Sequence, residues 1–193
     1  MKIVFASHNA HKRTEVQAIM AEVWPGLELV APEGEPPVED GETFHDNALI
    51  KARAGYQASG LPAIADDSGI CVDALGGQPG IHSARYSDTG DDADNVAKLL
   101  DTLGDEPERS AHFVCVAAVV DDHGDLAIEK KWHGTIAQAP HGAAGFGYDP
   151  IFIPDSLNHT AAQMPPEEKN QVSHRGQAFR ALAAVLRERY AGA

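Results

Sequence analysis

The sequence has few cysteines, few aromatic residues and no long apolar run. Its two cysteines, Cys71 and Cys115, lie far apart inside apolar segments. This placement favours buried free thiols over a disulfide or a metal-binding pair. The first apolar segment, IVFA, is too short for a signal-peptide core or a membrane span. We therefore expect a cytoplasmic protein that has no membrane partner.

Positive charge is also scarce. The chain of 193 residues has 15 Lys and Arg against 29 Asp and Glu, a formal net charge of -14. Such a surface argues against non-specific binding to DNA or RNA, whose phosphates require basic side chains. A small anionic ligand is still compatible with this charge, because a few local cations or a bound metal reverse the sign of one site. We expect no nucleic-acid partner.

Several common functional motifs are missing. The chain contains no GxxxxGK[ST] phosphate loop, no GxGxxG, no HExxH, no CxxC and no GxSxG. What it does contain is an alternation of apolar runs and amphipathic segments, without repeats or a linker, which predicts a single α/β domain over residues 1–193. An antiparallel hairpin within it favours a mixed sheet. The expected strands are residues 3–6, 27–30, 63–65, 111–120 and 126–136. One expected helix ends near residue 24, and three others span residues 43–60, 95–103 and 173–190.

The segment ADDSGICVDALGGQPG, residues 65–80, follows a short apolar run. If the strand ends at Ala65, then Asp66, Asp67 and Ser68 lie where α/β proteins place ligand-binding residues. Carboxylate oxygens suit Mg²⁺, which takes one or two protein carboxylates and completes its shell with water and phosphates. The same residues are also typical of an Asx turn without any catalytic role. The residues alone leave both interpretations open.

Three further segments have a functional and a structural interpretation. In SHNAHKRTE, Ser7, Asn9 and Lys12 suit a phosphate site at a helix N-terminus, or simply a capped helix. In GFGYDPIF, Phe146 suits stacking on a nucleobase, or a tight turn over the core. In EEKNQVSHRG, cations precede the last helix, which is either functional or an ordinary charged helix start.

Taken together, these segments resemble the inosine/xanthosine triphosphate pyrophosphatase family over nearly the whole chain. The order of the motifs agrees with that of the family, and the long DDSG block and the pairing of GFGYDP with SHRG are its most specific parts. The matching segments are residues 7–15, 42–52, 65–87, 145–152 and 173–182.

This resemblance implies a fold, a reaction and a set of site residues. The fold is an elongated twisted mixed sheet flanked by helices, with two lobes, a central active-site cleft and a homodimer. The reaction is the Mg²⁺-dependent hydrolysis of deaminated purine nucleoside triphosphates to the monophosphate and pyrophosphate. Asp67 is the implied catalytic residue, and Glu39 and Asp67 the metal ligands. The implied substrate-binding residues are Ser7, His8, Asn9, Ala10, His11, Lys12, Ser68, Phe146, Gly147, Tyr148, Asp149, Lys169, His174 and Arg175.

Within this family, the chemistry of Arg175 bears on base choice. Its guanidinium has only donors, so it suits the O6 acceptor of hypoxanthine or xanthine and not the amino group of adenine. Two alternatives remain at this stage: a related septum-inhibitor-like pyrophosphatase acting on pyrimidine or modified nucleotides, and a nucleotide-binding regulator without catalysis. A comparison of inosine, uridine and thymidine triphosphates separates the first, and any Mg²⁺-dependent turnover excludes the second.

Overall fold

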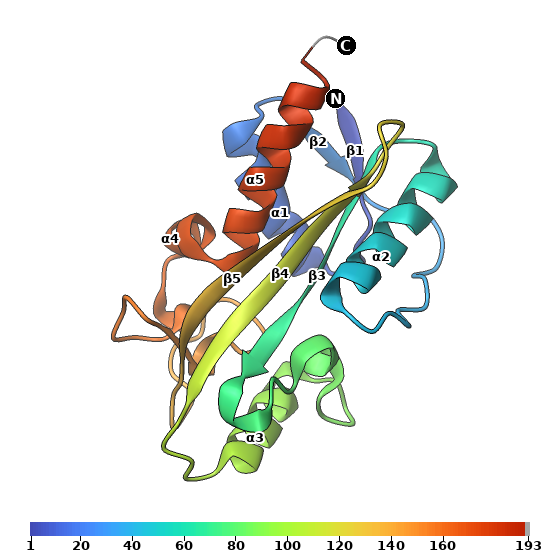
Figure 1. Ribbon diagram of the computed structural model, residues 1–193. Helices are drawn as coiled ribbons and strands as arrows, with labels where there is room; N and C mark the ends of the chain where they lie inside the picture. Colours follow the sequence, from blue (N-terminus) through green and yellow to red (C-terminus); the bar gives the residue numbers. More distant parts are fainter. Residues whose placement is uncertain (192–193) are drawn as a thin grey trace. The chain divides into compact units, whose positions relative to one another are not determined.

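The computed structural model describes residues 1–191, which form a mixed sheet with flanking helices (Figure 1). The strands are β1 (Lys2–Phe5), β2 (Glu28–Val30), β3 (Ala63–Val72), β4 (Ser110–Val120), β5 (Leu126–Ile136) and β6 (Phe152–Pro154). The helices are α1 (Ala10–Val23), α2 (Phe44–Ser59), α3 (Asp92–Leu103), α4 (Pro166–Val172) and α5 (His174–Arg189). Single 3₁₀ turns occupy Asp73–Leu75, Gly80–Arg85, Asp149–Ile151 and Ala161–Gln163.

The six strands lie in the order β2-β1-β3-β4-β5-β6. β1 pairs with β2 and with β3 in parallel, whereas β5 pairs with β6 antiparallel. Both kinds of pairing therefore occur in one sheet, which confirms the predicted mixed α/β fold. The predicted hairpin strand over residues 126–136 is confirmed at both ends.

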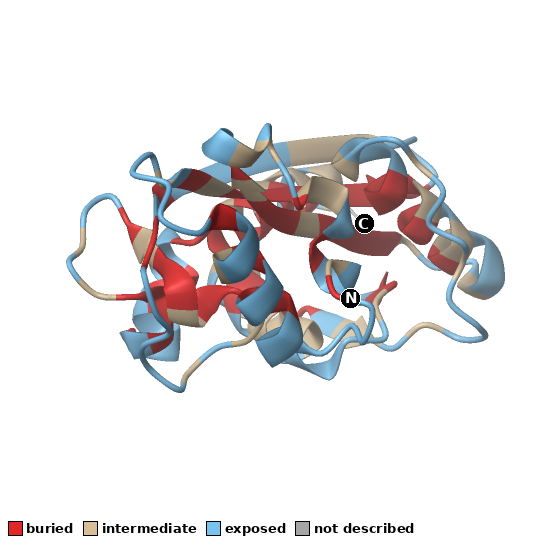
Figure 2. Cartoon of the chain, turned by 90° about the horizontal axis from the view of Figure 1, so that it is seen from below, coloured by how far each residue is buried: buried red, intermediate tan, exposed pale blue. Residues whose placement is uncertain are grey.

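The chain forms two compact units. The first contains residues 1–67, 115–130 and the segment from Arg175 onwards, and the second contains residues 68–114 and 131–174. Their boundaries fall inside β3, β4 and β5. Each unit has its own hydrophobic core, and buried residues run along the strands while most loops are exposed (Figure 2). The single domain expected from the sequence stays a prediction.

In the first unit, alternation along β1 sends side chains to two faces of the sheet. Ile3 and Phe5 belong to the core that α1 and α5 cover, with Phe5 packed edge-on against Phe179 at 5.8 Å between ring centroids. Val4 lies on the other face, beside Gly55 of α2. Helices therefore cover both faces of this part of the sheet.

The core of the second unit gathers residues from its strands, from α3 and from the segment after β5. Phe113, Trp132 and Phe152 form its aromatic centre, with ring centroids 4.7 Å apart between Phe113 and Phe152. The other large members are Ile70, Val72, Val96, Leu99, Leu103, Ile136, Tyr148, Ile151 and Met164.

Two predictions about local structure are wrong. The strand expected over 63–65 continues to Val72, so Asp66 and Asp67 lie in the middle of β3 rather than in a loop or Asx turn after it. The pairing of both carboxylates with buried cations, described below, is the physical reason. The helix expected over 95–103 begins at Asp92, because Asp91 caps its N-terminus by accepting hydrogen bonds from the amides of Ala93 and Asp94. Helix α4 was not predicted, and neither was strand β6, whose residues were expected to lie in a glycine-rich loop over 140–154.

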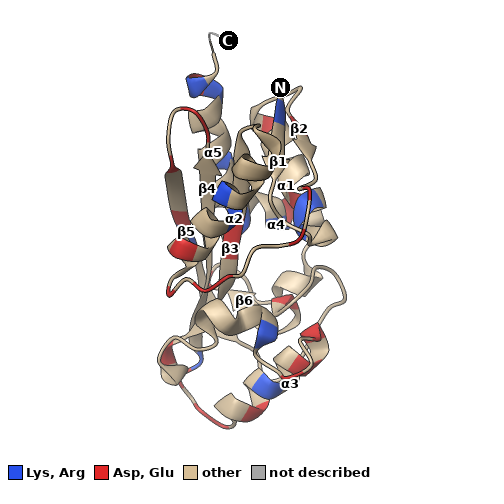
Figure 3. Cartoon of the chain, turned by 90° about the vertical axis from the view of Figure 1, so that its right-hand side faces the viewer, with Lys and Arg blue, Asp and Glu red and all other residues tan. Residues whose placement is uncertain are grey.

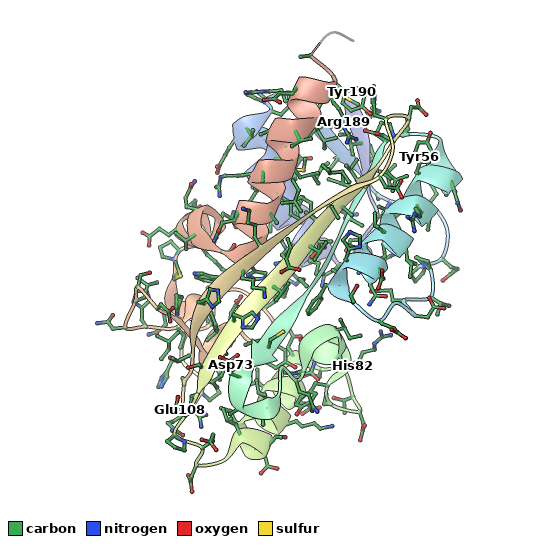
Figure 4. The ribbon with its side chains drawn as sticks, in the orientation of Figure 1. Tyr56, Asp73, His82, Glu108, Arg189 and Tyr190 are labelled. Carbon is green, nitrogen blue, oxygen red and sulfur yellow. The ribbon has the colours of Figure 1, made fainter. Side chains whose placement is uncertain are left out.

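The turn between β4 and β5 is held by charged contacts in the first unit. Asp121 is buried and accepts hydrogen bonds from Arg189 at 3.0 Å and from the hydroxyl of Tyr190 at 2.9 Å. Tyr56 of α2, which is labelled with Arg189 and Tyr190 in Figure 4, donates to Asp122 in the same turn. The turn is thus tied to both α2 and α5.

Helix α2 lies close to the sheet at Gly55, so we expect any side chain at this position to destabilise the fold. A Cβ on Gly55 would lie 2.9 Å from that of Ala6 and 3.2 Å from that of Ala63. We expect Gly55→Val to lower the free energy of unfolding by about 1–3 kcal/mol, because the added methyl groups overpack this contact. Urea denaturation measures the change. Ala58→Val on the exposed side of the same helix is the control and is expected to cost only about 0.5 kcal/mol; equal losses would contradict the packing argument.

Candidate active site

The two adjacent aspartates of β3 face opposite sides of the sheet. Asp66 is 1% exposed and lies 3.0 Å from the ammonium of Lys12 in α1 and 3.4 Å from Arg175 in α5. Asp67 is 8% exposed and lies 2.9 Å from the ammonium of Lys51 in α2. Successive residues of a strand point in opposite directions, so the two carboxylates meet different helices.

Their environments shift the two carboxyl pKa values in opposite directions. Burial by itself raises the pKa of Asp66, but the charges of Lys12, Arg175 and Lys51 outweigh burial and hold this pKa well below its ordinary value. For Asp67, burial dominates and raises the pKa, and the ion pair with Lys51 offsets it only in part. Asp66 is therefore a fixed negative charge, whereas Asp67 is the better proton acceptor of the two.

Lys51 links Asp67 to the acidic loop that precedes α2. Its ammonium donates to Asp67 at 2.9 Å and to Glu39 at 2.8 Å, so both carboxylates converge on one cation. The loop contributes Glu39 from a segment rich in acidic residues, which Figure 3 shows in red. Burial lowers the pKa of Lys51, but Asp67 and Asp66 raise it more, so the group is charged.

The donor chemistry of Glu39 and Asp67 fits Mg²⁺. The ion takes one or two protein carboxylates and draws its other ligands from water and substrate phosphates. Both carboxylates already form ion pairs with one cation, the ammonium of Lys51. Among residues 1–191, no group of three or more His, Cys, Asp or Glu side chains is arranged for a metal ion. The pair of Glu39 and Asp67 supplies the one or two carboxylates that Mg²⁺ takes from a protein.

Two residues of this cluster were missed by the sequence analysis. Lys51 is one, and Asn47, whose amide lies 3.5 Å from Asp67, is the other. They are four residues apart in ETFHDNALIKA, which places them on one face of α2. That spacing of an amide and a cation on a predicted helix was the available signal.

The segment SHNAHK has a clear structural role at the start of α1. Asn9 caps the helix, because its side-chain oxygen accepts from the amide of Lys12 at 3.0 Å. Ser7 accepts from the amide of Asn9 at 3.3 Å, and a ring nitrogen of His8 lies 3.2 Å from the carbonyl oxygen of Gly34. Ala10 and His11 are exposed in the first turn. The capped helix start is thus confirmed, and phosphate binding here stays a prediction.

Arg175 is buried within the first unit and has two carboxylate partners. Its guanidinium lies 2.8 Å from Glu15 and 3.4 Å from Asp66, and the residue is 3% exposed. Glu15 was missed, although its place three residues after Lys12 puts both on one face of α1. Arg175 therefore neutralises buried carboxylates, and the hydrogen bond to a base oxygen stays a prediction.

The second unit contains the other cluster of predicted residues. Asp149 is buried and accepts from the ammonium of Lys169 at 2.6 Å and from the amide of Phe146 at 2.9 Å. The same ammonium lies 5.1 Å from the centre of the Phe146 ring. We call Gly145–Asp149 the aromatic loop. Lys169, Phe146 and Asp149 are thus brought together from two segments.

The remaining predicted residues of this unit have structural contacts. Tyr148 is buried, and its hydroxyl donates to the carbonyl of Ser83 at 2.8 Å. His174 stacks on Phe113 with 4.6 Å between ring centroids. The amide of Gly147 donates to Asp92 at 2.7 Å, and Ser68 lies half-buried in β3. Their contacts with a substrate stay predictions.

Comparison with known proteins gives consistent matches over the whole chain. The model of the Ham1 family matches residues 3–185. A dITP/XTP pyrophosphatase from Leifsonia xyli subsp. xyli is 50% identical, over 97% of this chain and 96% of that protein. A dITP/XTP pyrophosphatase from Streptomyces avermitilis is 47% identical, over 97% and 98%.

Solved structures agree with these sequence matches. A HAM1 protein from Coxiella burnetii has 42% identity and a TM-score of 0.85, over 97% of this chain and 99% of that one. The Ham1 protein of Staphylococcus aureus has 38% identity and a TM-score of 0.86, over 98% and 100%. In residues 1–191 no helix has the length and apolar character that a membrane crossing needs. Sequence, motifs and fold thus agree, and the chain belongs to the Ham1 family.

Proposed function

We propose that this protein hydrolyses nucleoside triphosphates to the monophosphate and pyrophosphate, and that deaminated purine nucleotides such as ITP, dITP and XTP are its substrates. The observation that carries the proposal is the convergence of Asp67 and Glu39 on Lys51, with the next carboxylate of β3, Asp66, paired with Lys12 on the other face of the strand. Relatives that carry the name dITP/XTP pyrophosphatase and match nearly the full chain support the same reaction.

Glu39 and Asp67 are the residues that would hold Mg²⁺ in this proposal. When bound, the ion reduces the negative charge of the triphosphate and makes its phosphorus more electrophilic. An acidic protein gains from this, because the formal net charge of -14 otherwise repels the substrate.

Asp67 acts as general base in the proposed reaction. It accepts a proton from a water molecule as the water oxygen forms a bond to the α-phosphorus, and the bond from that phosphorus to the bridging oxygen breaks. Pyrophosphate leaves with the electron pair of that bond. Burial suits Asp67 to this role, because a raised pKa makes it a stronger base than an ordinary aspartate.

The other predicted residues bind the substrate. Lys12 and Lys169, with Ser7 and Asn9, contact phosphate oxygens, and the Phe146 ring stacks on the base. The same proposal includes contacts between the nucleotide and nine further residues: His8, Ala10, His11, Ser68, Gly147, Tyr148, Asp149, His174 and Arg175. The proposal also includes a homodimer in the cytoplasm and a cleft that binds the nucleotide.

Product analysis tests the reaction directly. Purified protein with ITP and Mg²⁺ is expected to release inosine monophosphate and pyrophosphate in equal amounts, with no orthophosphate. ITP and XTP are expected to exceed ATP, UTP and TTP in kcat/KM. Chromatography of the nucleotides and an enzymatic pyrophosphate assay measure both. Preference for a pyrimidine would favour the septum-inhibitor-like alternative, and absence of turnover would favour the regulator.

A substitution at Asp67 tests the general base. We expect Asp67→Asn to lower kcat by at least ~10²-fold, within the ~10²–10⁴ typical of losing such a group. The free energy of unfolding is expected to change little, because Lys51 keeps its ion pair with Glu39. Steady-state kinetics with ITP measures the loss. Wild-type kcat in this variant would remove Asp67 from the mechanism.

A substitution at Asp66, the neighbouring aspartate, is expected to lower the free energy of unfolding. Asp66→Asn leaves Lys12 and Arg175 without this buried counter-ion. We expect the free energy of unfolding to fall by about 3 kcal/mol at neutral pH, the range for breaking a buried pair. Because the folded-state pKa of Asp66 is lowered, the difference is complete above about pH 4 and shrinks as the pH falls below it.

Urea denaturation at several pH values measures this difference. The exposed aspartate Asp101 of α3 gives the control, Asp101→Asn, which is expected to stay within about 0.5 kcal/mol of the wild type. If Asp66→Asn were as stable as this control at neutral pH, the ion pairs of Asp66 would not stabilise the fold.

A further inference from the structure

The aromatic loop is ordered from within by Asp149. Phe146 donates its amide to this carboxylate at 2.9 Å, and Gly145 has a φ of 75° that brings its backbone against the same side chain. A side chain at position 145 would collide with Asp149. These contacts give the loop its shape. Its C-terminal end is also fixed to the rest of the unit, because Asp149 pairs with Lys169 of α4 and the buried Tyr148 donates to Ser83.

A cavity lies between the aromatic loop and α3. Its volume is about 400 Å³, and the side chains that line it from α3 are those of Asp92, Ala93, Val96, Ala97 and Leu100. The other wall is formed by Pro140, residues 143–147 and Pro150. Because of this space, close packing does not hold Phe146 and Gly147 against α3, whereas Tyr148 is buried in the core.

One hydrogen bond spans the two walls. The amide of Gly147 donates to the carboxylate of Asp92 at 2.7 Å, across 55 residues of sequence. Asp92 stands in the first turn of α3, and Asn95 in the same turn anchors the helix by accepting from the amide of Ser87 at 2.6 Å. The acceptor is therefore presented from a fixed helix end, and the donor, Gly147, is next to Phe146 in sequence.

We infer that Asp92 is a positioning residue, which holds the aromatic loop so that the Phe146 ring is in place to stack on the base. The inference rests on the proposed function, since it assigns the base to this ring. Asp92 itself touches no reacting atom. The base that the ring contacts takes no part in the bond changes at phosphorus, so stacking on it is equal in the bound substrate and the transition state. Loss of the hydrogen bond between Gly147 and Asp92 therefore affects KM and leaves kcat unchanged.

Three variants test the role. We expect Asp92→Ala to raise KM for ITP about tenfold, since a hydrogen bond to an ionised acceptor is lost, with kcat within about twofold of wild type. Asp92→Asn keeps an acceptor oxygen and is expected to recover most of the wild-type KM. Asp94→Ala is the matched control, because Asp94 is the other acid in the first turn of α3 and contacts Thr89 instead. It is expected to keep wild-type KM and kcat.

Product inhibition separates base positioning from a general loss of structure. In Asp92→Ala, the inhibition constant of inosine monophosphate is expected to rise in parallel with KM, while that of pyrophosphate stays constant. Hydrogen exchange of the peptide covering residues 143–150 is expected to quicken in Asp92→Ala and to return to the wild-type rate in Asp92→Asn.

The outcomes distinguish this inference from the proposed function. Failure of the wild type to hydrolyse ITP would overturn the proposed function. If the wild type is active and Asp92→Ala matches Asp94→Ala in KM, the positioning role is wrong. Equal weakening of inosine monophosphate and pyrophosphate, or a fall in kcat without a change in KM, would also overturn it.

Discussion

The burial of two adjacent carboxylates inside one strand is the constraint on which the first unit depends. An ionised carboxylate removed from water needs a cation and hydrogen bonds to compensate. Because Asp66 and Asp67 point to opposite faces of β3, one helix cannot serve both. Lys12 and Arg175 come from α1 and α5, and Lys51 comes from α2. The helices on each face therefore contribute cations as well as apolar side chains.

This arrangement gives the two carboxylates different chemistry from the same backbone. Asp66 meets cations from two helices, so its negative charge is held over the whole physiological range. Asp67 has a closer balance between burial and the charge of Lys51, which raises its pKa. The electrostatic difference comes from the number of cations on each side of the strand.

The second unit also contains a buried carboxylate, that of Asp149, which is paired with a cation. Asp149 accepts from both Lys169 and the backbone of Phe146, so a single acid orders a cation and an aromatic ring. The loop is held at its C-terminal end by this ion pair and by Tyr148, which is buried in the core and donates to Ser83. Nearer the ring, the amide of Gly147 donates to Asp92 of α3 beside a cavity. The contacts of Gly147 therefore bear on the neighbouring Phe146 ring more than on the core.

The motifs and the apolar pattern were sufficient to predict the family, the mixed sheet and most of the element boundaries. Local signals were sufficient there: Thr43 and Gly60 mark the ends of α2, and the turn at residues 121–125 marks a hairpin. Which charges meet depends on the tertiary structure. Glu15, Asn47 and Lys51 lie within matching motifs and Asp92 lies outside them, but each acts through a partner distant in sequence. The same cause explains the wrong strand end at Ala65: two aspartates continue a strand only when cations from other elements neutralise them, and such pairing is a property of the folded chain.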